Sequence, residues 1–315
     1  MVIAKRYKNL SSTEKKGEGD LEVKEYPALF GESDSLAVSA EKNYFRLLKS
    51  KTLLMILTAS IALVASLVGN LNDTIKSLSA LVSAISLISV LAVNLFRELR
   101  KFDHTWFDSR AVAESVKTET WCYMMNVKPY DGSLISRPDS IFIARLNEIL
   151  HNRSSISSEL SVHTQSSSEI TERMRQVKAA GFQDRKDCYV RERLHYQRTW
   201  YAERAKNAKK EECRWLALNW VFQFAAVITA VIFIYIGFWV NLAGSLTTMA
   251  TGALSWSQAR RHRELSQSYG LVSQELAFLE EHANQALTEE ALANIVIETE
   301  RTISREHNIW LTRRF

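Results

Sequence analysis

Two uncharged stretches of the chain carry hydroxyl and amide side chains at helical spacing. In 77–96 and again in 239–256 these side chains recur at steps that place them on one face of an α-helix. They donate and accept hydrogen bonds, and in hydrocarbon they must find a protein partner or water. The residues of the two stripes are Ser79, Ser83, Ser86 and Asn94, and then Asn241, Ser245, Thr248 and Ser255.

The stripes have two interpretations. Small and hydroxyl residues let membrane helices approach closely, and Gly244, Thr248 and Gly252 have the small-xxx-small spacing of such a packing seam. Alternatively, the stripes line a water-filled pore once several chains assemble, and the eight residues are then pore-lining candidates. Both interpretations stay open, since a seam in a closed state could become a lining in an open one.

Sequence motifs of catalysis are missing. The chain has no G-x-x-x-x-G-K-[ST], no G-x-S-x-G, no H-E-x-x-H and no paired C-x-x-C. Its seven histidines are dispersed, and its three cysteines are scattered and odd in number. We therefore predict a protein that is not an enzyme, with no catalytic residue, no metal site and no cofactor.

The elements that must hold the stripes are membrane-spanning helices. No Asp, Glu, Lys or Arg occurs from 215 to 259, and only Asp73 and Lys76 interrupt 52–96, in a chain that is 24% charged. Roughly 20 apolar helical residues cross a bilayer core about 30 Å thick. We therefore predict an all-α protein with four transmembrane helices, arranged as two hairpins at about 52–69 with 77–96 and 215–236 with 239–256.

Basic residues crowd the ends of both hairpins, and the two turns carry almost no charge. Because Lys and Arg stay on the cytoplasmic side of membranes, both hairpins should enter from the cytoplasm and return to it, which leaves both termini cytoplasmic. The first hairpin would serve as the insertion signal. No charged residue lies inside any expected span to couple ions or protons, which disfavours a transporter.

A basic amphipathic helix over about 184–214 leads into the third span. Its charge could bind nucleic acid, but it runs directly into the membrane, so anionic lipid headgroups are the simpler partner. We expect the lipid bilayer as a partner and no specific nucleic acid. Within the third span, Asn219 and Gln223 lie one turn apart and should bond to a neighbouring helix.

The remaining segments divide the chain into two halves of similar plan. Residues 1–36 are polar and without pattern, and we expect them to be disordered. The first two-transmembrane domain then covers 37–151, a serine-rich linker covers 152–168, and the second domain covers 169–315. Each half has a basic lead-in, two spans and a cytoplasmic helix, which is the plan of a parallel repeat.

Long cytoplasmic helices should follow each hairpin. Helical spacing of apolar residues continues from the second span to about residue 127, and a polar helix over about 257–286 follows the fourth. Arg110, Glu114 and Glu275 are our candidates for ion pairs that keep these helices in register. The alternative is that they form ordinary surface pairs worth less than about 1 kcal/mol.

Segments beside the spans resemble a known family. In the second half these are 187–194 (DCYVRERL), 197–201 (QRTWY) and Ala205-Lys206, and in the first half Trp106, Arg110, Ala113-Glu114-Ser115, Lys117 and Trp121. Together they are similar to the SMODS- and SLOG-associating two-transmembrane effector (SLATT) domains of bacteria, in two tandem copies over about 37–150 and 169–312.

The resemblance implies a membrane effector of bacterial conflict or antiphage systems. Such domains are expected to form pores in the inner membrane when a soluble partner senses infection or a nucleotide signal. We predict a homo-oligomeric, gated pore that permeabilises or depolarises the membrane when its cytoplasmic helices pull the striped helices apart. The alternative is a non-conducting, membrane-anchored scaffold that recruits a soluble partner.

Overall fold

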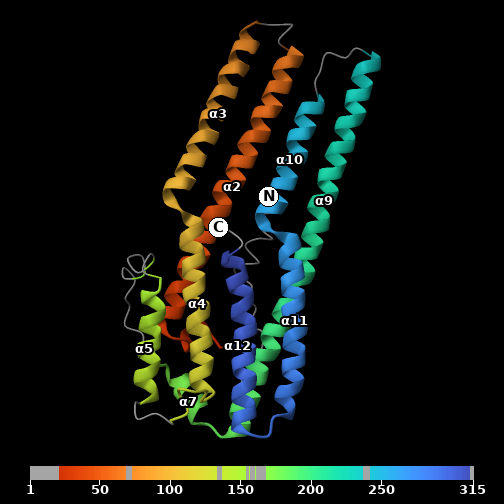
Figure 1. Ribbon diagram of the computed structural model, residues 1–315. Coiled ribbons are helices and arrows are strands. Elements are labelled where there is room, and N and C mark those ends of the chain that lie inside the picture. The colour runs from red at the N-terminus through yellow and green to blue at the C-terminus, as the bar shows by residue number, and fades with distance from the viewer. Residues whose placement is uncertain are drawn as a thin grey trace. The chain divides into compact units, whose positions relative to one another are not determined.

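In a computed structural model the chain is helical along nearly all of the residues described, which are 21–68, 73–132, 137–153, 156, 160, 168–236 and 242–312 (Figure 1). Those residues contain no strand, so the predicted all-α class is confirmed. In chain order the elements are the 3₁₀-helix η1 (Val23–Glu25), α2 (Ala28–Val68), α3 (Asp73–Arg100), α4 (Phe102–Met124), α5 (Pro138–His151), α7 (Glu172–Ala179), α8 (Phe182–Tyr189), the π-helix η3 (Val190–His195), α9 (Tyr196–Ile236), α10 (Leu242–Arg260), α11 (His262–Gln285) and α12 (Glu289–Thr312).

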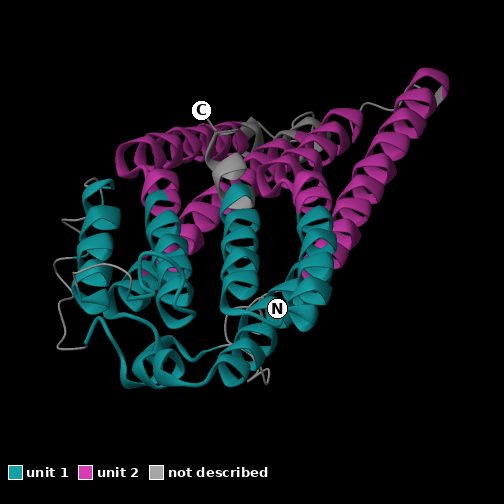
Figure 2. Ribbon diagram, turned by 60° about the horizontal axis from the view of Figure 1, so that its bottom comes forward, with its two compact units in different colours: residues 1–35, 108–203, 269–315 teal, residues 36–107, 204–268 magenta. Residues whose placement is uncertain are grey.

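The helices divide between two compact units (Figure 2). Unit 1 comprises Met1–Ser35, Asp108–Glu203 and Tyr269–Phe315, and unit 2 comprises Leu36–Phe107 and Arg204–Ser268. Both units take residues from the first and the second half of the chain. The boundaries between the units therefore fall inside the long helices α2, α4, α9 and α11, and not between the two halves of the sequence.

Unit 1 has a conventional buried core. Trp121 of α4, Tyr189 of α8, Leu194 of η3 and Leu276 of α11 are fully buried. α12 adds a buried face at helical spacing, formed by Leu292, Val296, Thr299 and Ile303. Thr288 caps the start of α12, because its hydroxyl accepts a hydrogen bond from the Ala291 amide at 3.2 Å.

The segment just before the first hairpin is folded, contrary to our expectation of disorder over 1–36. Residues 21–36 form η1 and the start of α2, and Leu21, Tyr26 and Phe30 are buried in unit 1. Residues 1–20 lie outside the described residues. Tyr26 and Phe30 pack on α4, where the Lys117 ammonium lies 5.3 Å from the Tyr26 ring centroid and 5.8 Å from that of Phe30.

The long helix expected from the second span to about residue 127 is interrupted. Lys101 has a positive φ of 44° and separates α3 from α4, and the polar helix of the second half is separated from α10 in the same way by Arg261, at φ 53°. α4 itself ends near the expected position. There Asn126, at φ 54°, closes the helix while the Val127 amide donates to the Cys122 carbonyl.

Unit 2 contains the helical segments expected for the four spans, in α2, α3, α9 and α10, and α2 and α10 are in close contact (Figure 1). A Cβ at Gly252 of α10 would lie 3.3 Å from Thr52 Cγ2 of α2. Further along the same pair, the Ser245 hydroxyl donates to the Ala59 carbonyl at 3.1 Å. Small residues thus allow the two hairpins to pack through their inner helices, as the seam interpretation predicted for Gly252.

Candidate functional site

The polarity of α3 is inverted relative to a helix of a water-soluble protein. Its hydroxyl stripe faces the rest of unit 2, with Ser86 buried, while its apolar side chains face outward. The outward face consists of Leu78, Leu81, Ile85, Ile88, Leu91, Leu95 and Leu99, each more than half exposed. Exposing such a face to water would cost on the order of 10 kcal/mol, a cost that hydrocarbon removes.

The outer helix of the second hairpin, α9, has the same inversion. Phe224, Val227 and Ile234 are exposed, whereas Asn219 is buried. The Gln223 amide donates to the Asn219 side-chain oxygen at 3.2 Å. These two residues therefore bond to each other within α9, and a further bond to a neighbouring helix stays a prediction.

Two helical stretches are long and apolar enough to cross a membrane, judged by length and composition over the described residues. They lie within Ser77–Met124 and Phe182–Tyr235, and only 6% and 11% of their most apolar windows are buried. The core helix of a soluble protein would be mostly buried, so the exposure of both windows indicates membrane helices. They coincide with the expected second and third spans.

The structure places the stripe residues in several different environments. On α3, Ser79, Ser83 and Asn94 are half-buried and Ser86 is buried. On α10, Ser245 is buried against α2, Thr248 is half-buried, and Ser255 is exposed. The Thr248 hydroxyl donates to the Gly244 carbonyl of its own helix at 2.9 Å. Asn241 lies outside the described residues.

Two of the stripe residues are therefore packed against other helices of the same chain. Ser86 and Ser245 are turned into unit 2, and the Ser245 hydrogen bond uses a backbone carbonyl of α2 as its acceptor. A hydroxyl satisfied in this way needs no water. Whether the stripes also line a pore stays a prediction.

Aromatic side chains from four helices meet where unit 2 changes from apolar to charged sequence. The Phe45 ring of α2 lies 5.6 Å from the Trp106 ring of α4 and 6.2 Å from the Trp256 ring of α10. Trp215 of α9 lies 6.2 Å from Trp256. The Arg260 guanidinium lies 3.5 Å from the Phe45 ring centroid, and we call these five residues the aromatic cap.

The sequence-predicted ion-pair residues are all paired in unit 1. Arg110 contacts Asp34 of α2 at 3.0 Å and Glu114 at 2.6 Å, and the Glu114 carboxylate raises the pKa of Arg110. Glu275 of α11 contacts Arg305 of α12. Arg110 thus ties α4 to α2, and Glu275 ties α11 to α12.

A cleft beside α4 also holds charges that are already neutralised. Glu114, Ser115, Asn152 and Arg153 are among the residues that line it. Glu114 is bound to Arg110, and Arg153 contacts Asp108 at 2.8 Å. Because both charged groups have partners, the cleft offers no unpaired charge for a ligand.

The strongest polar contact in unit 1 is a buried ion pair that sequence reasoning missed. Arg193 of η3 makes two hydrogen bonds to Glu300 of α12, at 2.8 Å and 2.6 Å, with the side chains 0% and 3% exposed. Thr118 and Tyr189 donate to the same carboxylate at 2.9 Å and 3.3 Å. This bidentate geometry joins α4, α8, η3 and α12 at one point.

The basic lead-in of the third span is partly internal, which corrects its assignment as a headgroup-binding surface throughout. Arg185, Lys186 and Arg193 are buried in unit 1. The Lys186 ammonium donates to the Asn284 and Ala286 carbonyls at the end of α11. Exposed cations of the lead-in include Arg191 in η3 and Lys209 in α9.

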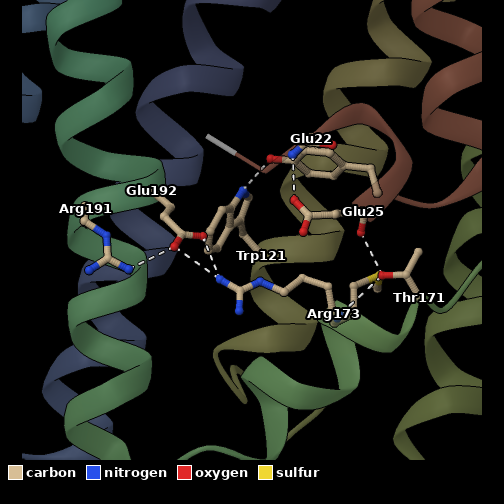
Figure 3. A network of polar contacts seen from close by, with 9 residues as sticks. Glu22, Glu25, Trp121, Thr171, Arg173, Arg191 and Glu192 are labelled. Atoms are coloured by element: carbon tan, nitrogen blue, oxygen red, sulfur yellow. Dashed lines mark hydrogen bonds and ion pairs between the residues drawn. The ribbon is translucent and has the colours of Figure 1, made fainter. Parts of the chain in front are cut away.

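A second polar network joins the segment around η1 to α7 and α4 (Figure 3). The Thr171 hydroxyl, which caps α7, donates to the Glu25 carbonyl at 2.7 Å. The Trp121 indole donates to the Tyr26 hydroxyl at 3.0 Å. Segments from both halves of the sequence are thereby bonded within unit 1.

Among the described residues we looked for a metal site and for a reactive cysteine thiol. These residues contain no group of three or more His, Cys, Asp or Glu side chains placed to hold a metal ion. Burial raises the pKa of the Cys122 and Cys188 thiols, which disfavours the reactive thiolate at both positions.

Comparison with known families identifies the family of this chain. A model of the SMODS and SLOG-associating 2TM effector domain 3 matches residues 27–186, and a model of the SMODS and SLOG-associating 2TM effector domain 1 matches residues 189–310. The chain belongs to the SLATT family. No curated protein and no solved structure matches it.

The two SLATT domains adjoin within α8, while most of the linker that we placed at 152–168 lies outside the described residues. The residues that carried the resemblance now have physical roles. Tyr189, Arg193, Leu194 and Trp121 are fully buried in unit 1. The SLATT sequence pattern of this chain is therefore largely the pattern of the core of unit 1.

Proposed function

We propose that this SLATT protein is a bacterial membrane effector that permeabilises or depolarises the inner membrane in an antiphage or conflict system. The observation that carries the proposal is the inverted polarity of α3 and α9 inside two tandem 2TM effector domains. Four spans, as two hairpins with both termini cytoplasmic, follow from the basic residues at the hairpin ends. The protein acts without catalysis, a cofactor or a metal.

Conduction in this proposal requires several copies. A single chain offers four spans, and two of its stripe residues, Ser86 and Ser245, are engaged within their own unit. A homo-oligomer would bring the half-buried stripe residues, such as Ser83 and Thr248, to a common axis. A soluble partner that senses infection or a nucleotide signal would trigger this change through the helices of unit 1.

Ion flux through proteoliposomes tests the proposal. With the partner protein and trigger present, we expect flux from the purified protein, reduced several-fold by Ser83→Leu and by Thr248→Leu because each replaces a hydroxyl on the conducting path. Ser77→Leu and Thr251→Leu are matched controls, since they make the same changes at exposed positions of the same helices. Flux unaffected by the first two variants would place the path elsewhere, and the particle size in nanodiscs would give the copy number.

A non-conducting scaffold is the second candidate. The observation that favours it is the satisfied hydrogen bond between Ser245 and the Ala59 carbonyl, which makes a packing seam sufficient to explain that residue. Absence of flux with the partner protein and trigger present, together with stable binding of that partner, would establish the scaffold instead.

A further inference from the structure

The two helix breaks of unit 2 occupy equivalent positions in the two SLATT domains. Lys101 follows Phe96 by five residues, and Arg261 follows Trp256 by five. The residue before each break is an arginine that stacks on that aromatic ring: the Arg100 guanidinium lies 5.6 Å from the Phe96 centroid, and that of Arg260 lies 5.5 Å from Trp256. The pattern aromatic-x-x-x-Arg-Lys/Arg therefore carries the same local structure twice.

At each break the helix resumes at once. The Lys101 carbonyl accepts from the Thr105 amide at 3.2 Å, and the Arg261 carbonyl accepts from the Leu265 amide at 2.9 Å. Asn126 shows the contrast, because there a positive-φ residue is followed by turns and no continuing helix. A single left-handed residue between two helices is a bend that one change of backbone conformation would straighten.

The residue types at the bends keep that change accessible. Glycine adopts a positive φ without cost and is the usual residue where a helix ends permanently. Lysine and arginine pay a steric cost there and are good helix formers, so they penalise the bend and favour the continuous helix. The surrounding contacts must therefore hold the bent form.

Those contacts are in the aromatic cap. Trp106 lies five residues after the first bend and packs on Phe45, while Arg260, directly before the second bend, stacks on the same ring. Arg260 also contacts Glu41 of α2 at 3.5 Å. Residues beside both bends therefore contact Phe45. Straightening the first bend would move Trp106 relative to the Phe45 ring, and straightening the second would move Arg260 relative to it.

We propose that Lys101 and Arg261 are paired hinges, at which α3 with α4 and α10 with α11 switch between the bent form and one continuous helix, and that straightening opens the aromatic cap into the conducting state. The last clause rests on the proposed function, whereas the hinge itself does not. The bent form with the cap closed is the resting state.

Alanine and glycine at the hinges test the proposal, because both remove the charge and differ only in backbone preference. Lys101→Ala with Arg261→Ala favours the straight form, and Lys101→Gly with Arg261→Gly favours the bent form. The two pairs should differ in the straight-to-bent ratio by at least about tenfold per hinge. Basal flux should be higher in the alanine pair than in the glycine pair.

Spin-label distances report the bend without reference to flux. In full-length protein with Cys213→Ser, label pairs at Leu81→Cys with His104→Cys, and at Thr247→Cys with Gln267→Cys, span the two hinges with exposed sites inside unit 2. Straight helices would separate the paired Cα atoms by about 35 Å and about 30 Å, and bends shorten both distances. Cys188 is buried and Cys122 is half-buried, and the raised pKa of both thiols slows their reaction with the label.

Each outcome is decisive. A longer distance in the alanine pair than in the glycine pair, with flux changing in the same sense, supports the proposal. Equal distances in both pairs overturn the hinge, even if the protein conducts. Distances that shift while no variant conducts retain the hinge and refute the proposed pore. If the alanine pair fails to fold, the glycine pair must still give shorter distances and lower flux than wild type when both are measured with the partner protein and trigger present.

Discussion

At the scale of single residues, Arg193 and Glu300 place opposite charges where water reaches neither. A buried pair adds little net stability compared with well-packed apolar residues, but removal of one partner leaves an unpaired charge that is strongly destabilising. The carboxylate here also accepts from Thr118 and Tyr189, so its loss would leave further donors unsatisfied. The pair therefore specifies how η3 meets α12 more than it raises stability.

Arg193→Met should lower the free energy of unfolding by about 3–5 kcal/mol, because it leaves the Glu300 charge buried without its partner. The measurement is denaturant or thermal unfolding of the purified protein in detergent. Arg191→Met is the matched control: Arg191 is exposed, pairs only with Glu192 in the contacts seen, and its loss should cost less than about 1 kcal/mol.

Adding Glu300→Leu to Arg193→Met should restore most of that loss, since an apolar pair can replace a buried ion pair at little cost. A double variant as unstable as the single one would contradict this account and show that the hydrogen bonds of Thr118 and Tyr189 dominate.

At the scale of elements, the close approach of α10 to α2 depends on one glycine. A Cβ at Gly252 would lie 3.3 Å from Thr52 Cγ2 and 3.6 Å from Ile56 Cδ1, so any longer side chain must push the helices apart. Gly252→Leu should destabilise the fold by about 1–3 kcal/mol through overpacking. Gly244→Leu, at an exposed position of the same helix, is the control, and equal melting temperatures of the two variants would refute the seam.

Much of the element pattern was accessible from sequence. The charge-free stretches predicted α3 and α9, because the length and apolar composition that a membrane span needs are local properties of the sequence. The breaks at Lys101 and Arg261 were missed, since both residues favour helices and neither is a usual left-handed residue. The repeated aromatic-x-x-x-Arg-Lys/Arg spacing was the signal available for them.

The Arg193–Glu300 pair was also beyond sequence reasoning. Its members are 107 residues apart, and the π-helix η3 shifts the buried face in a way that a period of 3.6 residues does not predict. Residues 21–36 were assigned to disorder from composition alone. Their order depends on tertiary contacts with α4 and α7, which no local pattern contains.

At the scale of the whole molecule, the remaining question is on which side of the membrane each end of a hairpin lies. From the basic residues flanking the hairpins we predict that the start of α3 lies outside the cytoplasm and that α4 lies inside it. Thr74 at the start of α3 and Ser115 in α4 are exposed positions. Cysteines there, in a Cys213→Ser background, should differ in their access to a reagent that cannot cross the membrane.

In intact bacterial spheroplasts, a membrane-impermeant maleimide should label Thr74→Cys and should label Ser115→Cys only after lysis. The physical reason is that α3 crosses the bilayer once between the two positions, through the uncharged stretch 77–96. Labelling of Ser115→Cys after lysis is the control for its reactivity. If both cysteines reacted equally in intact spheroplasts, α3 would not cross the membrane, its exposed leucine face would need a protein partner instead, and the pore would be excluded.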